Sequence, residues 1–255
     1  MEVPHHPQVE KKSFKEYFLE FLMIFLAVTM GFIAENIRES ISEHKLVKEY
    51  AALLVKDITG DSIQLKKYRQ YYHFANEKVD TLLQMLAQSD PKNIPSGKLY
   101  WYGLFGGAQG SFIANDATLQ QIKNTGTLRY FKRDIADDIA NYDRLCQNLQ
   151  SFQEMGQALY AEVRKSRAQI FELKYNDAAN EIFQYGKTSD NSGKIYFFIN
   201  SNPPLLSYDK VLFNIYAEMV RSRFLFINVA SSDSILHHGH LLMEELNREY
   251  PQKND

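Results

Sequence analysis

The residues best suited to hold a metal ion lie near the C-terminus. His237, His240 and Glu244 follow one another at steps of three and four, the spacing that brings side chains to one face of a helix. Imidazole nitrogens and a carboxylate are ligands that Zn²⁺ accepts in proteins. The alternative is that these are ordinary surface residues, with His240 packed or hydrogen-bonded in the helix seam. We favour that alternative and predict neither a metal site nor a cofactor.

Other signatures of chemistry are missing from the sequence. It contains no glycine-rich phosphate loop, no nucleophile elbow and no paired-cysteine metal motif. The one cysteine, Cys146, excludes an internal disulfide. The formal net charge of −2 argues against a nucleic-acid partner, which would call for a concentrated excess of Lys and Arg. We therefore predict a protein that is not an enzyme, and a metal-dependent enzyme is the least favoured alternative.

An aromatic, glycine-rich stretch from 100 to 107 is a second candidate site. Its large aromatic residues are Tyr100, Trp101, Tyr102 and Phe105. Such side chains line ligand pockets and anchor protein partners, but they also close the end of a hydrophobic core. We favour an ordered loop that caps one end of a helical bundle, with a ligand or partner loop as the alternative.

The strongest pattern in the sequence is an apolar run near the N-terminus. Residues 21–34 carry no charge, and aromatic residues extend the run back to Phe14. A helix over 14–34 is long enough to cross a hydrocarbon core roughly 30 Å thick. The side chains predicted to lie in lipid are Phe21, Leu22, Ile24, Phe25, Leu26, Val28 and Phe32. A signal peptide and a buried core helix are the alternatives to a retained anchor.

Two features inside this run bear on function. Glu20 is a carboxylate within the predicted span, where acidic residues often serve proton transfer or partner contact; a position near the headgroups is the favoured alternative. Ala27 and Gly31 are one helical turn apart, and such small residues let two membrane helices approach closely. They predict an oligomer contact, and incidental small residues explain the pattern equally well.

The orientation of the anchor follows from its basic flanks. Lys11, Lys12 and Lys15 precede the run and favour a cytoplasmic N-terminus, because basic flanks stay in the cytoplasm. Basic residues within 38–48 weaken this argument. We expect a single-pass inner-membrane protein with its main domain in the periplasm.

The remaining sequence predicts an all-α fold. The predicted organisation is an N-terminal tail over 1–13, a transmembrane helix over 14–36, an elongated antiparallel helical bundle over 37–250 and a C-terminal tail over 251–255. The first long helix continues to about 87, with a regular apolar seam in which Asp61 is the one polar residue. Gly60 beside it marks a candidate bend.

The later helices are read from caps and apolar spacing. A short helix over 117–125 follows Asn115 and Asp116 as N-cap and stops at Gly126, a predicted left-handed cap. The other predicted elements are a second long helix over 133–173, a helical piece over 178–185, a surface turn over 186–193, a strand or buried loop over 194–200, and a third long helix from a Ser207 cap to about 250. The seam predicted for that third helix includes Leu212, Ile215, Met219, Ser222, Phe226, Leu236, His240 and Met243.

Two blocks resemble a known family. They are 14–39, FKEYFLEFLMIFLAVTMGF followed by AENIRE, and 117–129, ATLQQIKNTGTLR, together with 135–142. They are similar to a family of uncharacterised single-pass membrane proteins of certain Gram-negative bacteria. The resemblance implies an inner-membrane protein of helical fold and implies no activity.

Two functions follow from these observations. The leading hypothesis is a membrane-anchored helical interaction or scaffold protein, a homo-oligomer or a subunit of an envelope assembly, whose partners are membrane lipid and protein. The alternative is an extracytoplasmic domain that senses or binds a ligand among the aromatic residues around Trp101.

Overall fold

The computed structural model describes residues 13–185, 191–227 and 229–251, and every regular element in these ranges is a helix. The predicted all-α class is confirmed for them. The predicted tails 1–13 and 251–255 lie almost wholly outside the described residues, as does most of the turn predicted over 186–193. The α-helices are α1 (Phe14–Gln88), α2 (Ser96–Leu104), α3 (Ala117–Thr125), α4 (Arg133–Ala168), α5 (Leu173–Tyr185), α6 (Ser192–Ile199), α7 (Lys210–Phe226) and α8 (Val229–Glu249), with 3₁₀ turns η1 (Pro91–Asn93), η2 (Phe105–Gly107) and η3 (Thr127–Tyr130).

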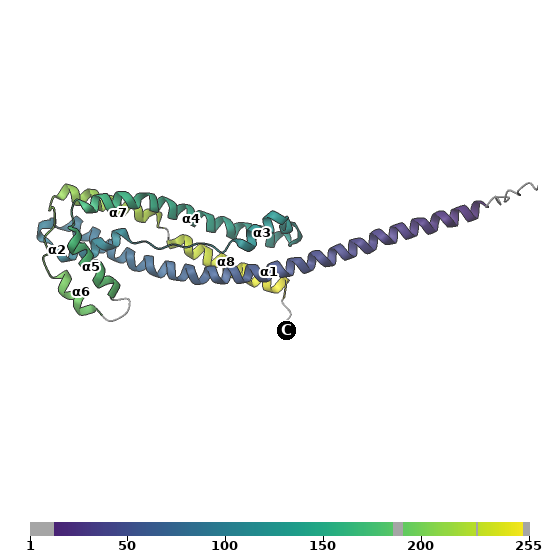
Figure 1. Cartoon of the computed structure of the whole chain (residues 1–255), viewed down its shortest axis with the longest axis horizontal. Coiled ribbons are helices and arrows are strands. Elements are labelled where there is room, and N and C mark those ends of the chain that lie inside the picture. The colour runs from purple at the N-terminus through teal and green to yellow at the C-terminus, as the bar shows by residue number, and fades with distance from the viewer. Residues whose placement is uncertain (1–12, 186–190, 228, 252–255) are drawn as a thin grey trace, which may run out of the picture.

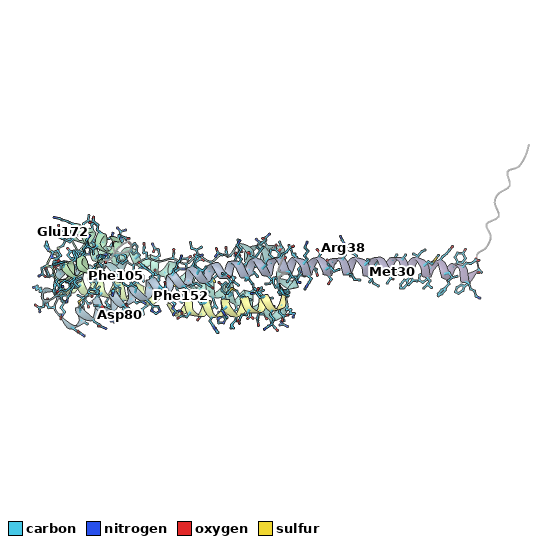
Figure 2. The ribbon with its side chains drawn as sticks, turned by 90° about the horizontal axis from the view of Figure 1, so that it is seen from below. Met30, Arg38, Asp80, Phe105, Phe152 and Glu172 are labelled. Carbon is cyan, nitrogen blue, oxygen red and sulfur yellow. The ribbon has the colours of Figure 1, made fainter. Side chains whose placement is uncertain are left out.

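Helix α1 has two parts with opposite surroundings. It is one continuous helix of 75 residues, about 110 Å long. It starts after Ser13, whose backbone N–H donates to the Glu16 carboxylate at 2.7 Å. Its buried residues begin only at Val47, and the part before them projects alone from the rest of the molecule (Figure 1). Figure 2 labels Met30 and Arg38 on this uncovered part.

In the part of the molecule that follows Val47 of α1, the long helices lie side by side. Helix α1 packs against α7 and α8, and α4 packs against the same two helices. Helices α2, α5 and α6 gather at the end of the molecule opposite the projecting part (Figure 1). The seam predicted for α1 is confirmed from Ala51 to Leu82, and every position of it in that range is buried, including Asp61.

Two hydrophobic clusters fill the interior. The proximal core, nearer the projecting part of α1, includes Val47, Leu54, Ile58, Leu65, Ile139, Leu149, Ile235 and Leu246. The distal core includes Val79, Leu82, Tyr100, Trp101, Phe105, Phe171, Phe213 and Tyr216. Burial of these apolar side chains at about 25 cal/mol per Å² is the main force that holds the helices together.

The short helix α3 agrees with its predicted bounds, 117–125. Gly126 follows it with φ +68°, and its N–H donates to the carbonyls of Ile122 and Lys123. The predicted left-handed cap is therefore confirmed. Beyond the cap, Leu128 and Tyr130 pack against the proximal core.

Two segments expected to be irregular or extended are helices. The aromatic stretch 100–107, predicted as a loop, forms the end of α2 and the turn η2, because Tyr100, Trp101 and Phe105 pack on the distal core with helical spacing. The stretch 194–200, predicted as a strand or buried loop, lies largely within α6. There Ile195, Phe198 and Ile199 share one partly buried face.

The long helices after α1 are shorter than predicted. Helix α4 ends at Ala168, not near 173, where the Ser166 hydroxyl bonds back to the carbonyls of Glu162 and Val163. The predicted third long helix is two helices. Ile227, with ψ of 78°, ends α7, and its β-branched side chain, which favours helix less than an unbranched one, is buried in the proximal core.

The cap of α7 is Asp209 and not the predicted Ser207. The Asp209 carboxylate accepts the Val211 N–H at 2.7 Å, while the Ser207 hydroxyl accepts the Asp209 N–H at 3.1 Å. The seam predicted for this region is also wrong by about one residue. The buried positions of α7 are Phe213, Tyr216, Val220 and Arg223, and those of α8 include Ile235, Leu242 and Leu246.

Candidate functional site

Residues 108–116, which we call the strap, link η2 to α3 without helical structure. Buried backbone N–H and C=O groups need partners, and side chains of the long helices supply them here. From α1, the Tyr72 hydroxyl accepts the Gly110 N–H at 2.8 Å and donates to the Gly110 carbonyl at 2.9 Å. The Tyr71 hydroxyl accepts the Gln109 N–H at 3.2 Å. The strap is thereby attached to α1 at two successive residues.

Helix α4 holds the middle of the strap through one amide side chain. Gln153 Oε1 accepts the Phe112 N–H at 2.8 Å, and Gln153 Nε2 donates to the Phe112 carbonyl at 3.0 Å. The amide thus pairs with Phe112 as a neighbouring β-strand would. Gln157, one turn further along α4, accepts a hydrogen bond from Gln109 Nε2 at 3.1 Å.

The end of the strap is held by a buried acid. Asp61 is 1 % exposed. Its Oδ1 accepts both the backbone N–H and the side-chain Nδ2 of Asn115, each at 2.8 Å, and its Oδ2 accepts the Tyr142 hydroxyl at 3.0 Å. Burial raises the pKa of the Asp61 carboxyl, and the hydrogen bonds from Asn115 and Tyr142 oppose that rise. Burial also raises the pKa of the neighbouring Cys146 thiol to about 12. A thiol with so high a pKa is a poor nucleophile at neutral pH.

The start of the strap is held by a buried cation, Arg223 of α7, which is 2 % exposed. Its Nη1 donates to the Gly106 carbonyl at 3.2 Å, its Nη2 to the Ala108 carbonyl at 2.6 Å and its Nε to the Gly156 carbonyl at 3.2 Å. Burial lowers the pKa of the Arg223 guanidinium, and Tyr72 and Tyr160 oppose that change. In the part of the chain that the structure describes, no carboxylate forms an ion pair with Arg223.

A groove of about 420 Å³ opens beside the strap. It is bounded by α1, α4, the strap and the end of α7. Its lining comprises Tyr68, Tyr72, Gln109, Gly110, Ser111, Phe112, Ile113, Gln150, Gln153, Glu154, Gly156, Gln157, Arg223 and Ile227. Apolar and amide side chains therefore share the groove with one buried positive charge.

The aromatic residues singled out in the sequence do not line this groove. Tyr100 and Trp101 are buried in the distal core at 0 % and 5 % exposure. The Tyr100 hydroxyl donates to the Pro204 carbonyl at 2.7 Å and accepts the Glu172 N–H at 2.9 Å. The Phe105 ring packs edge-on against Trp101, and Tyr102 is partly buried against the same core.

The histidine face does not converge on a metal position. His240 Nδ1 lies 3.7 Å from Glu244 Oε2, and both side chains are largely exposed; His237 is exposed as well. Within the described ranges, no group of three or more His, Cys, Asp or Glu residues is arranged to hold a metal ion. The expected packing of His240 in the seam is wrong, because Gly239 occupies the inward position, where an added Cβ would lie 3.0 Å from Ile58 and Tyr142.

The residues predicted to lie in lipid all belong to the uncovered part of α1. A window of this part has the length and mean hydropathy of a membrane-spanning helix, and none of it is buried in the protein. A signal sequence passes the same test, so the finding is a candidate span. Ala27 and Gly31 are exposed on it, and no other part of the described chain lies within 4 Å of a Cβ added at Gly31.

Sequence reasoning missed Arg223, Gln153 and the two tyrosines that hold the strap. Arg223 did carry a signal, because Tyr216, Val220, Arg223 and Ile227 follow one another at steps of four, three and four. A basic residue inside such an apolar stripe indicates a buried cation. The seam predicted one residue away placed Arg223 on the surface.

No family model, no curated protein and no solved structure matches this chain. The resemblance to single-pass membrane proteins therefore stays a prediction.

Proposed function

We propose that this protein is a membrane-anchored helical interaction protein, in which residues 14–34 lie in lipid and the packed helices form an elongated antiparallel bundle outside it. The observation that carries the proposal is the uncovered apolar surface of α1. Ile24, Met30 and Phe32 are 66 %, 68 % and 69 % exposed. A contiguous apolar surface of this length is unfavourable in water and calls for lipid or a partner.

The continuity of α1 supports a mechanical link between anchor and bundle. Residues 35–46 are helical but largely uncovered, and they span roughly 18 Å at 1.5 Å per residue. The Arg38 guanidinium pairs with Glu35 at the start of this stalk. Because one helix carries the anchor, the stalk and one wall of both cores, a rotation of the anchor would turn the bundle with it.

The proposed location is the inner membrane, with a cytoplasmic N-terminus and a periplasmic bundle. Lys11, Lys12 and Lys15, before and at the start of the span, favour this orientation. The proposed interaction is a homo-oligomer or an envelope assembly, with Ala27 and Gly31 allowing close approach of two spans.

Disulfide crosslinking in native membranes tests the oligomer. Ala27→Cys is made in a Cys146→Ala background, so that the new thiol is the only one in the chain. Oxidation is expected to give a covalent dimer. Val28→Cys is the matched control, because it points about 100° away around the helix and is expected to crosslink less. Equal crosslinking at both positions, or none at Ala27→Cys, contradicts contact through Ala27 and Gly31.

Ligand sensing is a second candidate function, and the groove beside the strap favours it. Tyr68 and Tyr72 of α1 line the groove. A molecule bound there would therefore contact the same helix that carries the proposed anchor.

A further inference from the structure

We infer that the groove beside the strap binds a small organic monocarboxylate with an apolar body, held by the Arg223 guanidinium. This inference deepens the second candidate function and rests on it. It does not depend on the membrane anchor.

The charge of Arg223 favours an anionic ligand. The guanidinium is buried at the groove, where it donates to three backbone carbonyls and its Cζ lies 5.5 Å and 5.7 Å from the ring centroids of Tyr160 and Phe224, none of which carries a negative charge. Carbonyls are dipoles and leave the net charge in place, and a buried charge without a counterion is unfavourable. A carboxylate in the groove would supply the missing negative charge.

The geometry of the guanidinium suits a carboxylate. Arginine carries five N–H groups in a planar fork that matches a carboxylate. The carbonyls of Gly106, Ala108 and Gly156 take three of them. One N–H on each of the two terminal nitrogens is left. The Tyr72 hydroxyl lies close enough to influence the pKa of Arg223 and is one acceptor within reach. A bound carboxylate would be another.

The volume and the lining of the groove favour a ligand with an apolar body. A groove of about 420 Å³ falls within the range of about 300–1,000 Å³ that is typical of small-molecule sites. Phe112, Ile113 and Ile227 offer it apolar surface, and four glutamines offer amide groups. An aromatic or branched aliphatic body fits this lining better than a sugar or a nucleotide.

A carboxylate in the lining of the groove limits the charge of the ligand to one. Glu154 also lines the groove, where its Oε1 accepts a hydrogen bond from Gln150 Nε2 at 3.1 Å. Its carboxylate would repel a second negative charge. A monocarboxylate is therefore favoured over a phosphate ester or a dicarboxylate.

Calorimetric titration of the full chain in lipid nanodiscs tests the inference, with empty nanodiscs as the blank. The probes are phenylacetate, 4-phenylbutanoate and 4-methylpentanoate, each compared with its own primary amide, which has the same shape and no charge. At least one acid is expected to bind about tenfold more tightly than its amide. Equal affinity for every acid and amide pair, or no heat from any acid at about 10 mM, overturns the inference.

Two groove variants show where the acid binds. Ser111→Trp places a large ring in the groove from an exposed position and is expected to abolish binding. Ser151→Trp is the matched control, since Ser151 is exposed on α4 and does not line the groove. Binding that survives Ser111→Trp, or that Ser151→Trp removes equally, contradicts the site.

A third variant tests the charge without disturbing Arg223, whose replacement would release three carbonyls and could unfold the strap. Ile113 lines the groove and is 74 % exposed. Ile113→Gln removes an apolar contact and is expected to weaken acid and amide alike, whereas Ile113→Glu is expected to weaken the acid at least about threefold more than Ile113→Gln does and to affect the amide no more than Ile113→Gln does. Identical losses for Glu and Gln argue against charge recognition. Crosslinking through Ala27→Cys involves no groove residue, so failure here and failure of the membrane-anchor proposal are distinguishable.

Discussion

Asp61 and Asn115 are joined by two hydrogen bonds that end on the same carboxylate oxygen, one from the Asn115 backbone and one from its side chain, each at 2.8 Å. The pair ties the middle of α1 to the end of the strap. Tyr142 of α4 donates to the other oxygen at 3.0 Å. The single polar residue in the seam of α1 is thus the point at which three segments of the chain meet.

Asp61→Ala is expected to lower the free energy of unfolding by about 3 kcal/mol, because it leaves the buried Tyr142 hydroxyl and the partly buried donors of Asn115 without an acceptor. Urea titration of the full chain in detergent micelles, followed by circular dichroism, measures the change. Asp80→Ala is the control, since Asp80 is exposed on the same helix, and it should change stability by less than about 0.5 kcal/mol. Equal effects of the two substitutions would show that the Asp61 cluster adds nothing to stability.

Asp61→Asn is expected to change how stability depends on pH. Burial raises the pKa of Asp61 in the folded state, so the folded protein binds this proton more tightly than the unfolded chain does. The stability that protonated Asp61 contributes to the folded state is therefore fully present below the pKa of the unfolded chain, about 3.9. It is lost as pH rises through the pKa of the folded state. Asparagine cannot ionise, so the variant should gain stability relative to the native chain in the window from about pH 4 up to the folded pKa of Asp61.

Urea titrations at several pH values across that window check the sign, with Asp80→Asn as the matched control. A native chain that gains stability over the variant as pH rises would mean that the carboxylate is favoured in the folded state. The hydrogen bonds from Asn115 and Tyr142 would then outweigh burial.

Gly126→Ala is expected to destabilise the protein by about 1 kcal/mol. Gly126 has φ +68°, and nothing lies within 4 Å of an added Cβ, so the whole cost comes from the left-handed backbone. Gly193→Ala is the comparison, because it also has open space around the Cβ but lies in α6 without a positive φ. It should be neutral or stabilising. Matching thermal shifts for the two variants would refute the role of backbone conformation.

Gly97→Ala is expected to separate α6 from α2. An added Cβ at Gly97 would lie 1.9 Å from the Phe198 carbonyl oxygen and 2.8 Å from that of Ser201. Both are backbone atoms, so no side-chain rotation relieves the clash, and the cost is expected to exceed about 3 kcal/mol. Hydrogen exchange of α6 should rise sharply in this variant; unchanged protection would mean that the contact between the two helices is not tight.

The sequence predicted α1 and α3 well because local signals define them. In α1 the seam repeats at regular spacing from Ala51 to Leu82 with Asp61 as its one polar residue, and in α3 the Gly126 stop is unambiguous. In α7 and α8 two neighbouring apolar stripes compete, since Leu212 and Ile215 lie beside Phe213 and Tyr216. Only packing against α1 and α4 decides between them, and the wrong choice hid Arg223 and placed His240 inward.

The strap could not be predicted, because its structure depends on partners distant in sequence. Gly110 and Phe112 take their hydrogen bonds from Tyr72 and Gln153, each about 40 residues away. No pattern within residues 108–116 themselves predicts an ordered segment. The groove beside the strap went unpredicted for the same reason, and the aromatic stretch that was the alternative ligand site is part of the distal core.

Alkaline carbonate extraction of membranes from a Gram-negative host that produces the full chain tests the central claim most directly. The protein is expected to stay at full length in the membrane pellet. Replacing Ile24 and Leu26 with aspartate is expected to move it to the supernatant, since each charge at the centre of a span costs about 3 kcal/mol. A native chain found in the supernatant, or one shortened by removal of residues 14–34, would contradict the account.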